Sequence, residues 1–206
     1  GGVSIVGRRV ELAALEERLV PGAIVTLTGP GGVGKSHIAS AMSGALGDRL
    51  PDGAWFVPLS AVVDPAALAG AIAQVLALAS DAMQPVIDRV AGALAPMRAL
   101  VVLDGIEHLL DGFHVRDRLA ALARRAPGVA WLVTSRVPLG IAGEQVVLVE
   151  PLDLPPPTVS PIEATSYAAV TLFVTRARRA LPGFALDAGN VADVAALCRL
   201  ADGLPL

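Results

Sequence analysis

The sequence TGPGGVGKS, at residues 28–36, decides how the rest of the chain is interpreted. It fits the pattern G-x-x-x-x-G-K-[ST], which is typical of a phosphate-binding loop. The apolar run 24–27 before it predicts a buried strand, and the small-residue pattern 38–42 after it predicts a helix. A strand, a glycine-rich loop and a helix in this order are the context in which the pattern binds phosphate. The alternative is a glycine-rich turn that binds nothing.

The residue types in this loop suit phosphate chemistry. Glycines allow the backbone to turn its N–H groups towards phosphate oxygens, and the N-terminus of the following helix adds positive potential. Lys35 can reach the β- and γ-phosphates, and the Ser36 hydroxyl can ligate Mg²⁺. Lys35 is also the only lysine of the chain, since every other strongly basic residue is arginine.

Composition narrows the class of protein. A length of 206 residues suits one domain, or one domain with part of a second. Hydrophobic residues make up 54% of the chain and aromatic residues only 3%, so we expect a globular core of Ala, Val and Leu. The net charge of -3 argues against this segment being the main nucleic-acid contact, which usually needs a basic face.

Two further features of the sequence indicate the cellular compartment. No run reaches the roughly 18 to 20 apolar residues that a membrane span needs, so we expect no membrane partner. Cys198 is the only cysteine and cannot form an internal disulfide, which favours a reducing, cytoplasmic setting.

Alternation of strand and helix patterns predicts an α/β fold. Strands are expected at 24–27, 54–59, 99–104, 129–134 and 145–149. Such alternation favours a parallel sheet flanked by helices on both faces, here of the P-loop NTPase class. Ligands of such sheets bind at the carboxyl ends of strands. The phosphate loop, Asp104 and the segment 134–136 all follow such ends, so we expect them to converge.

The character of the sequence changes after Pro151. A proline-rich segment at 154–157 predicts a stiff linker, followed by one long helix at about 161–180 and a last helix that ends near residue 200. We therefore expect a phosphate-loop α/β domain at 1–154 and the start of a small helical lid domain at 155–206. We expect this second domain to be truncated, because the sequence stops just after a helix.

A second chemical feature is the apolar run 100–104, which ends in Asp104. After a phosphate loop, such an aspartate holds Mg²⁺, usually through water. Efficient hydrolysis also needs a carboxylate that polarises the attacking water. The next residue, Gly105, has no carboxylate; Glu107 could serve, or it could be a surface helix residue. Arg136 could contact the γ-phosphate, or it could be a loop arginine in a salt bridge. The catalytic candidates are Lys35, Asp104, Glu107 and Arg136.

Several motifs in order resemble one known family. They are VGRRVEL at 6–12, the phosphate loop at 27–36, VVLDGIEHL at 101–109, the segment 133–144 that begins VTSR, and the segment 197–206 that contains GLPL. The chain resembles the NB-ARC-like nucleotide-binding module of signal-transduction ATPases with numerous domains, the STAND class. The likeness is strongest to bacterial transcription regulators of the large LuxR-type and AfsR-like groups.

The resemblance implies a regulatory switch. In the family, ADP is held between the sheet domain and a small helical domain in the off state. Exchange for ATP rearranges the domains and permits self-association, and hydrolysis resets the switch. DNA would be bound only through domains that this chain lacks.

The motif and the resemblance together predict the site. The resemblance places the motif at 6–12 and Pro205 beside the adenine, and gives Arg136 the γ-phosphate. The expected contacts with ATP or ADP are Val6, Arg8, Gly29, Gly31, Gly32, Val33, Gly34, Lys35, Ser36, His37, Arg136 and Pro205. The expected Mg²⁺ ligands are Ser36 and Asp104. Gly105 stands where many members of the family carry a second acidic residue. This difference bears on the rate of ATP hydrolysis and not on nucleotide binding.

Two interpretations therefore stay open for the module. It could be a slow ATPase with a conformational output, or a module that holds ADP as a structural ligand and hardly hydrolyses ATP. A metabolic kinase would need an acceptor pocket, for which the sequence shows no residues.

Overall fold

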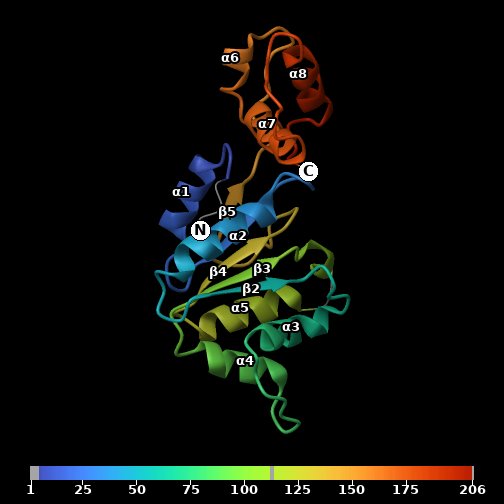
Figure 1. Ribbon diagram of the computed structural model, residues 1–206. Coiled ribbons are helices and arrows are strands. Elements are labelled where there is room, and N and C mark those ends of the chain that lie inside the picture. Colours follow the sequence, from blue (N-terminus) through green and yellow to red (C-terminus); the bar gives the residue numbers. More distant parts are fainter. Residues whose placement is uncertain (1–4, 112–113, 206) are drawn as a thin grey trace. The chain divides into compact units, whose positions relative to one another are not determined.

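The computed structural model describes residues 5–111 and 114–205 (Figure 1). The described residues form two compact units. The first contains residues 10–29, 35–111 and 114–148. The second contains residues 5–9, 30–34 and 149–205. Leu206, the last residue of the GLPL motif, lies outside the described residues. The expected boundary at 154/155 stays a prediction; the sequence did not indicate that 5–9 and 30–34 cluster with the C-terminal segment.

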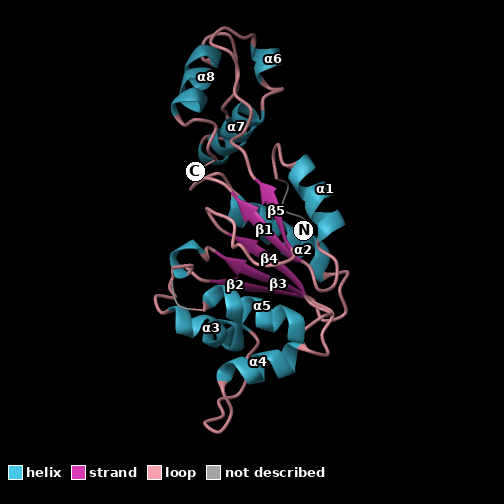
Figure 2. Cartoon of the chain, turned by 180° about the vertical axis from the view of Figure 1, so that it is seen from behind, coloured by secondary structure: helices cyan, strands magenta, loops and turns pink. Residues whose placement is uncertain are grey.

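The first unit holds a five-stranded parallel sheet in the order β2-β3-β4-β1-β5 (Figure 2). Its strands are β1 (Ile24–Thr28), β2 (Ala54–Pro58), β3 (Leu100–Asp104), β4 (Ala130–Thr134) and β5 (Glu144–Leu148). The three central strands are buried along almost their whole length, which explains why they are continuous apolar runs. The predicted parallel α/β sheet is confirmed.

Helices cover both faces of this sheet. On one face, α2 (Lys35–Gly47) contacts β2, β3 and β4. The other face forms a core with α3 (Leu68–Val75), α4 (Val86–Leu94) and α5 (Val115–Arg125), in which Val101, Leu103 and Trp131 are fully buried. Figure 1 shows α2 and the layer of α3, α4 and α5 on opposite sides of the sheet. The remaining elements of this part are α1 (Arg9–Arg18) and the short 3₁₀ helices η1 (Pro65–Ala67) and η2 (Glu107–Leu109).

The second unit is helical in its C-terminal part. Its helices are α6 (Pro161–Ala164), α7 (Ala168–Ala180) and α8 (Val191–Leu200), which share a small apolar core. The prediction of one helix over 161–180 is wrong. The hydroxyls of Thr165 and Ser166 donate to the carbonyls of residues 162 and 163, and Tyr167 is extended, so the helix restarts at Ala168. Among the described residues, no helix combines the length and the hydrophobicity that a membrane crossing requires.

Candidate functional site

Strand ends bring polar side chains together at one edge of the first unit's sheet. β3 ends at Asp104 and β4 ends at Thr134, and Leu27 of β1 is in register with Thr134. The Thr134 hydroxyl donates a hydrogen bond of 2.6 Å to Oδ1 of Asp104. The expected convergence of these strand ends is therefore present in the structure.

Lys35 opens α2 directly after the glycine loop and joins this cluster. It is 8% exposed, and its Nζ donates to the carbonyl oxygen of Gly29 at 2.8 Å. Burial lowers the pKa of Lys35; the carboxylates of Glu107 and Asp104 act against that shift, while Arg136 adds to it. Lys35 therefore lies within electrostatic reach of the other three catalytic candidates.

Glu107 occupies the first position of η2, and its side chain is 27% exposed. Oε1 lies 3.3 Å from Nε of Arg136. Oε2 is buried and has no hydrogen-bond partner among the residues that the structure describes. A buried carboxylate oxygen without a partner calls for an explanation, and a water that it would polarise supplies one. Of the two alternatives for Glu107, the geometry favours the site over a solvated helix face.

Arg136 follows β4 and is 67% exposed at its side chain. It does form the salt bridge that the sequence left open, but the partner is Glu107, itself a member of the cluster. The ion pair therefore keeps the guanidinium at the carboxyl edge of the sheet and leaves most of it accessible to a ligand.

The backbone explains why an acidic residue is missing after Asp104. Gly105 has a φ of 79° and donates its N–H to Oγ1 of Thr134 at 2.8 Å. A Cβ added there would meet no atom within 4 Å, so the strain would come from the left-handed backbone alone. The turn favours glycine at this position and leads the chain to Glu107.

The phosphate loop also depends on glycine. Gly29, Gly32 and Gly34 have φ values of 146°, 77° and 100°, which L side chains rarely adopt. Val33 is fully buried, whereas Ser36 and His37 are exposed. The exposed side of the loop therefore carries the Ser36 hydroxyl and the His37 side chain.

Ser36 and Asp104 carry oxygen ligands of the kind that Mg²⁺ binds. The Ser36 hydroxyl is exposed, and within the described residues the Asp104 carboxylate accepts only the hydrogen bond from Thr134, at Oδ1. Hard oxygen ligands from one or two side chains, completed by phosphate and water, are the set that Mg²⁺ prefers. No group of three or more His, Cys, Asp or Glu that could hold a metal occurs in residues 5–111 and 114–205, so these residues offer no separate all-protein metal cage.

Arg8 belongs to the second unit and is 3% exposed. It donates to the carbonyl oxygens of Glu150 at 2.7 Å and Val33 at 2.8 Å. These two bonds tie the segments 5–9, 30–34 and 149–205 of this unit to one another. The expected contact of Arg8 with nucleotide stays a prediction, and the structure adds a clamping role that the sequence did not indicate.

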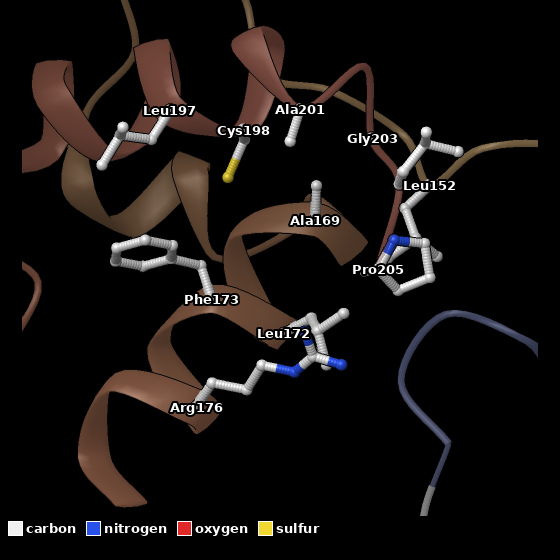
Figure 3. A pocket seen from close by; sticks show the side chains of 11 residues that line it. Leu152, Ala169, Leu172, Phe173, Arg176, Leu197, Cys198, Ala201, Gly203 and Pro205 are labelled. Carbon is white, nitrogen blue, oxygen red and sulfur yellow. The ribbon is translucent and has the colours of Figure 1, made fainter. Parts of the chain in front are cut away.

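Pro205 lines an apolar pocket of about 260 Å³ inside the second unit (Figure 3). A Cβ built on Gly34 would lie 3.3 Å from Cγ of Pro205, so the proline ring is beside the tip of the glycine loop. Val6, expected beside the adenine, is half-buried and is not among the lining residues. The other lining residues are Leu152, Ala169, Leu172, Phe173, Arg176, Leu197, Cys198, Ala201, Gly203 and Leu204.

Most of this lining was missed in the sequence, although a signal existed. Ala169, Leu172, Phe173 and Arg176 follow the spacing i, i+3, i+4, i+7, which places them on one face of α7. Cys198 lines the pocket from α8, and burial raises the pKa of its thiol, which keeps it protonated. Among the described residues, the pocket is therefore lined mostly by apolar side chains, together with the protonated thiol of Cys198 and the cationic side chain of Arg176.

Comparison with known proteins shows curated relatives without established roles. No family model matches the chain. An uncharacterized protein of Mycobacterium tuberculosis is 34% identical over 203 residues, which cover 98% of this chain and 48% of the relative. A second protein of that organism, named only provisionally as an HTH-type transcriptional regulator, is 34% identical over 183 residues, covering 89% of this chain and 19% of the relative. The chain thus spans about half the length of the first of these relatives and less of the second.

Solved structures give the fold. The ORC1 protein of Aeropyrum pernix, solved in complex with DNA, superposes with a TM-score of 0.59 at 20% identity over 98% of this chain and 62% of that protein. A STAND protein of Pyrococcus horikoshii with a tetratricopeptide repeat sensor gives 0.56 at 19% identity, over 100% of this chain and 29% of that protein. The A. pernix ORC2 protein in its ADPNP–ADP complexes gives 0.56 at 14% identity, over 86% of this chain and 54% of that protein. At these identities the likeness shows the fold alone, which is the α/β fold of P-loop NTPases.

Proposed function

We propose that the chain is the ATP/ADP-binding switch module of a bacterial signal-transduction or transcription regulator, and that it hydrolyses ATP slowly with Mg²⁺. The observation that carries the proposal is the cluster of Lys35, Asp104, Glu107 and Arg136 at the carboxyl edge of the sheet. The likeness to a protein that is provisionally named an HTH-type transcriptional regulator supports the regulatory part.

Each charged residue of the cluster has a distinct role in this proposal. The N–H groups of Gly32 to Ser36 bind phosphate oxygens, and the Lys35 ammonium neutralises the β- and γ-phosphates. Ser36 and Asp104 would hold Mg²⁺, which would neutralise charge that develops on the phosphates. Glu107 accepts a proton of the attacking water through Oε2, the oxygen without a partner among the described residues.

Arg136 distinguishes the two nucleotides. In the structure its guanidinium pairs with Glu107. A γ-phosphate offers it a stronger, doubly charged partner, so ATP and ADP stabilise different positions of Arg136. A difference in binding free energy of this kind is what a nucleotide needs to shift a conformational equilibrium.

The base is assigned to the second unit. The proline ring of Pro205 and the apolar wall of α7 suit the flat face of adenine, and Pro205 lies beside Gly34 of the loop. Self-association in the ATP state, DNA contact through other parts of a longer protein and a cytoplasmic location complete the proposal.

Phosphate release from ATP by the full-length protein tests the hydrolysis. We expect Mg²⁺-dependent turnover that disappears in Lys35→Ala and in Asp104→Ala. Asp111→Ala is the matched control, since Asp111 is an exposed carboxylate close in sequence to Asp104. Absence of turnover above background in the wild type would overturn the ATPase assignment.

A second function is favoured by Gly105. Its left-handed backbone leaves no acidic side chain directly after Asp104, so Glu107, which is paired with Arg136, is the remaining base. The module would then hold ADP as a structural ligand. Bound ADP that raises the unfolding temperature, together with no measurable turnover, would favour this function over the first.

A further inference from the structure

Thr134 is a buried polar residue for which the proposed function gives no role. It is the last residue of β4 and is 1% exposed. Val133, directly before it, is in register with Leu103, directly before Asp104. The sheet therefore fixes the Thr134 and Asp104 side chains as neighbours at the ends of adjacent strands.

The Thr134 hydroxyl accepts one hydrogen bond, from Gly105, and donates another, to Asp104. The Gly105 N–H donates to Oγ1 at 2.8 Å, and Oγ1 donates to Oδ1 of Asp104 at 2.6 Å. A backbone N–H can only donate and a hydroxyl carries one proton, so that proton must point at the carboxylate. The short O···O distance is typical of a hydrogen bond to a charged acceptor.

The backbone of Thr134 adds a third contact. Its carbonyl oxygen accepts from the N–H of Ile106 at 3.1 Å. Thr134 therefore bonds to three consecutive residues, from Asp104 to Ile106, and these form the turn that precedes Glu107. Both carboxylates of the proposed reaction are attached to this one turn.

We propose that Thr134 is a positioning residue that orients the Asp104 carboxylate towards Mg²⁺–nucleotide, an inference that rests on the proposed function. The hydroxyl engages Oδ1, and within the described residues no other group donates a hydrogen bond to this carboxylate. Oδ2 is therefore the oxygen that remains for the hydrated metal. Partners that orient a metal-binding side chain typically change metal affinity 10- to 100-fold when they are removed.

The test compares two substitutions in the full-length protein. Thr134→Val keeps the branched shape and removes the hydroxyl, whereas Thr134→Ser keeps the hydroxyl. ATP affinity is titrated against Mg²⁺ and also in EDTA. Mg²⁺ raises ATP affinity, and the concentration that gives half of this rise is the quantity to compare. We expect it to be about 10-fold higher in Thr134→Val than in the wild type. ATP affinity in EDTA should be unchanged. Thr134→Ser should stay within about twofold of the wild type.

Hydrogen exchange at the Gly105 amide gives a readout that does not involve nucleotide. We expect protection in the wild type and in Thr134→Ser, and faster exchange in Thr134→Val, because the acceptor of that N–H is gone. If Thr134→Val does not fold, Thr134→Ala removes the same hydroxyl and carries the same expectations.

Two failures can be told apart. A wild-type protein that binds ATP, combined with a Thr134→Val variant of unchanged Mg²⁺ dependence, overturns the positioning role and leaves the proposed function standing. A wild-type protein that binds no nucleotide overturns both.

Discussion

The charged edge of the sheet and the apolar pocket of the helical unit are built by different physical means. At the edge, charged side chains lie at the ends of strands and at the first positions of helices. A hydrogen bond between side chains, from Thr134 to Asp104, holds one of them in place. The pocket is lined by apolar side chains from one face of α7 and by the ring of Pro205, and the cationic side chain of Arg176 also lines it. Changes at the edge should therefore alter how phosphates are distinguished and cleaved. Changes in the pocket should alter affinity for every adenine nucleotide alike.

The largest effect is expected from Glu107→Gln, which removes the charge from the proposed base. ATP hydrolysis should fall about 100-fold or more, because general bases contribute that much to such reactions. ATP affinity should change little, as measured by titration calorimetry. Glu17→Gln, an exposed position on α1, is the control. Unchanged hydrolysis in Glu107→Gln would remove Glu107 from the chemistry.

The pH dependence of nucleotide affinity tests whether the charged form of Lys35 binds phosphate. The ammonium form binds phosphate, so affinity falls as pH rises through its pKa. Burial lowers that pKa, which places the fall below pH 10.5. Complete deprotonation should cost roughly 10- to 100-fold in affinity, the size of a hydrogen bond to a charged group. Lys35→Arg keeps the charge throughout, so its affinity should be flat over the same range.

Arg136→Ala tests whether the charged edge of the sheet distinguishes ATP from ADP. ATP affinity should fall about 10-fold through loss of a charge-assisted contact, while ADP affinity should stay within twofold. Arg124→Ala removes an exposed arginine of α5 and serves as control. Equal losses for ATP and ADP would mean that Arg136 does not report the γ-phosphate.

Leu172→Ala tests the pocket and is expected to have the smallest effect. Loss of apolar contact worth about one buried CH₂, about 0.8 kcal/mol, lowers affinity roughly fourfold. ATP and ADP should lose affinity by the same factor, because the base is common to both. A loss confined to ATP would contradict the assignment of the base to this pocket.

The edge was more predictable from the sequence than the pocket. The phosphate loop and the strand ending in Asp104 carry their chemistry in consecutive residues, and parallel strands bring their ends to one edge. The bond from Thr134 to Asp104 joins residues far apart in the chain and leaves no local pattern. Thr134 and Asp104 become neighbours only because β3 and β4 are adjacent in the sheet, and the sequence does not state the strand order.

Two features of the helical unit leave no pattern in the sequence. Arg8 donates to the carbonyls of Val33 and Glu150, and carbonyls carry no sequence signature because every residue has one. The break between α6 and α7 depends on whether Thr165 and Ser166 bond to their own turn, which helix periodicity does not encode.

The nucleotide that the purified full-length protein carries shows whether the chain is an ATP/ADP-binding module. Denaturation followed by chromatography identifies it, and titration of the emptied protein gives its affinity. We predict bound ADP and measurable affinity for both ADP and ATP. A protein that carries no nucleotide and shows no affinity for either would exclude the proposed nucleotide-binding function.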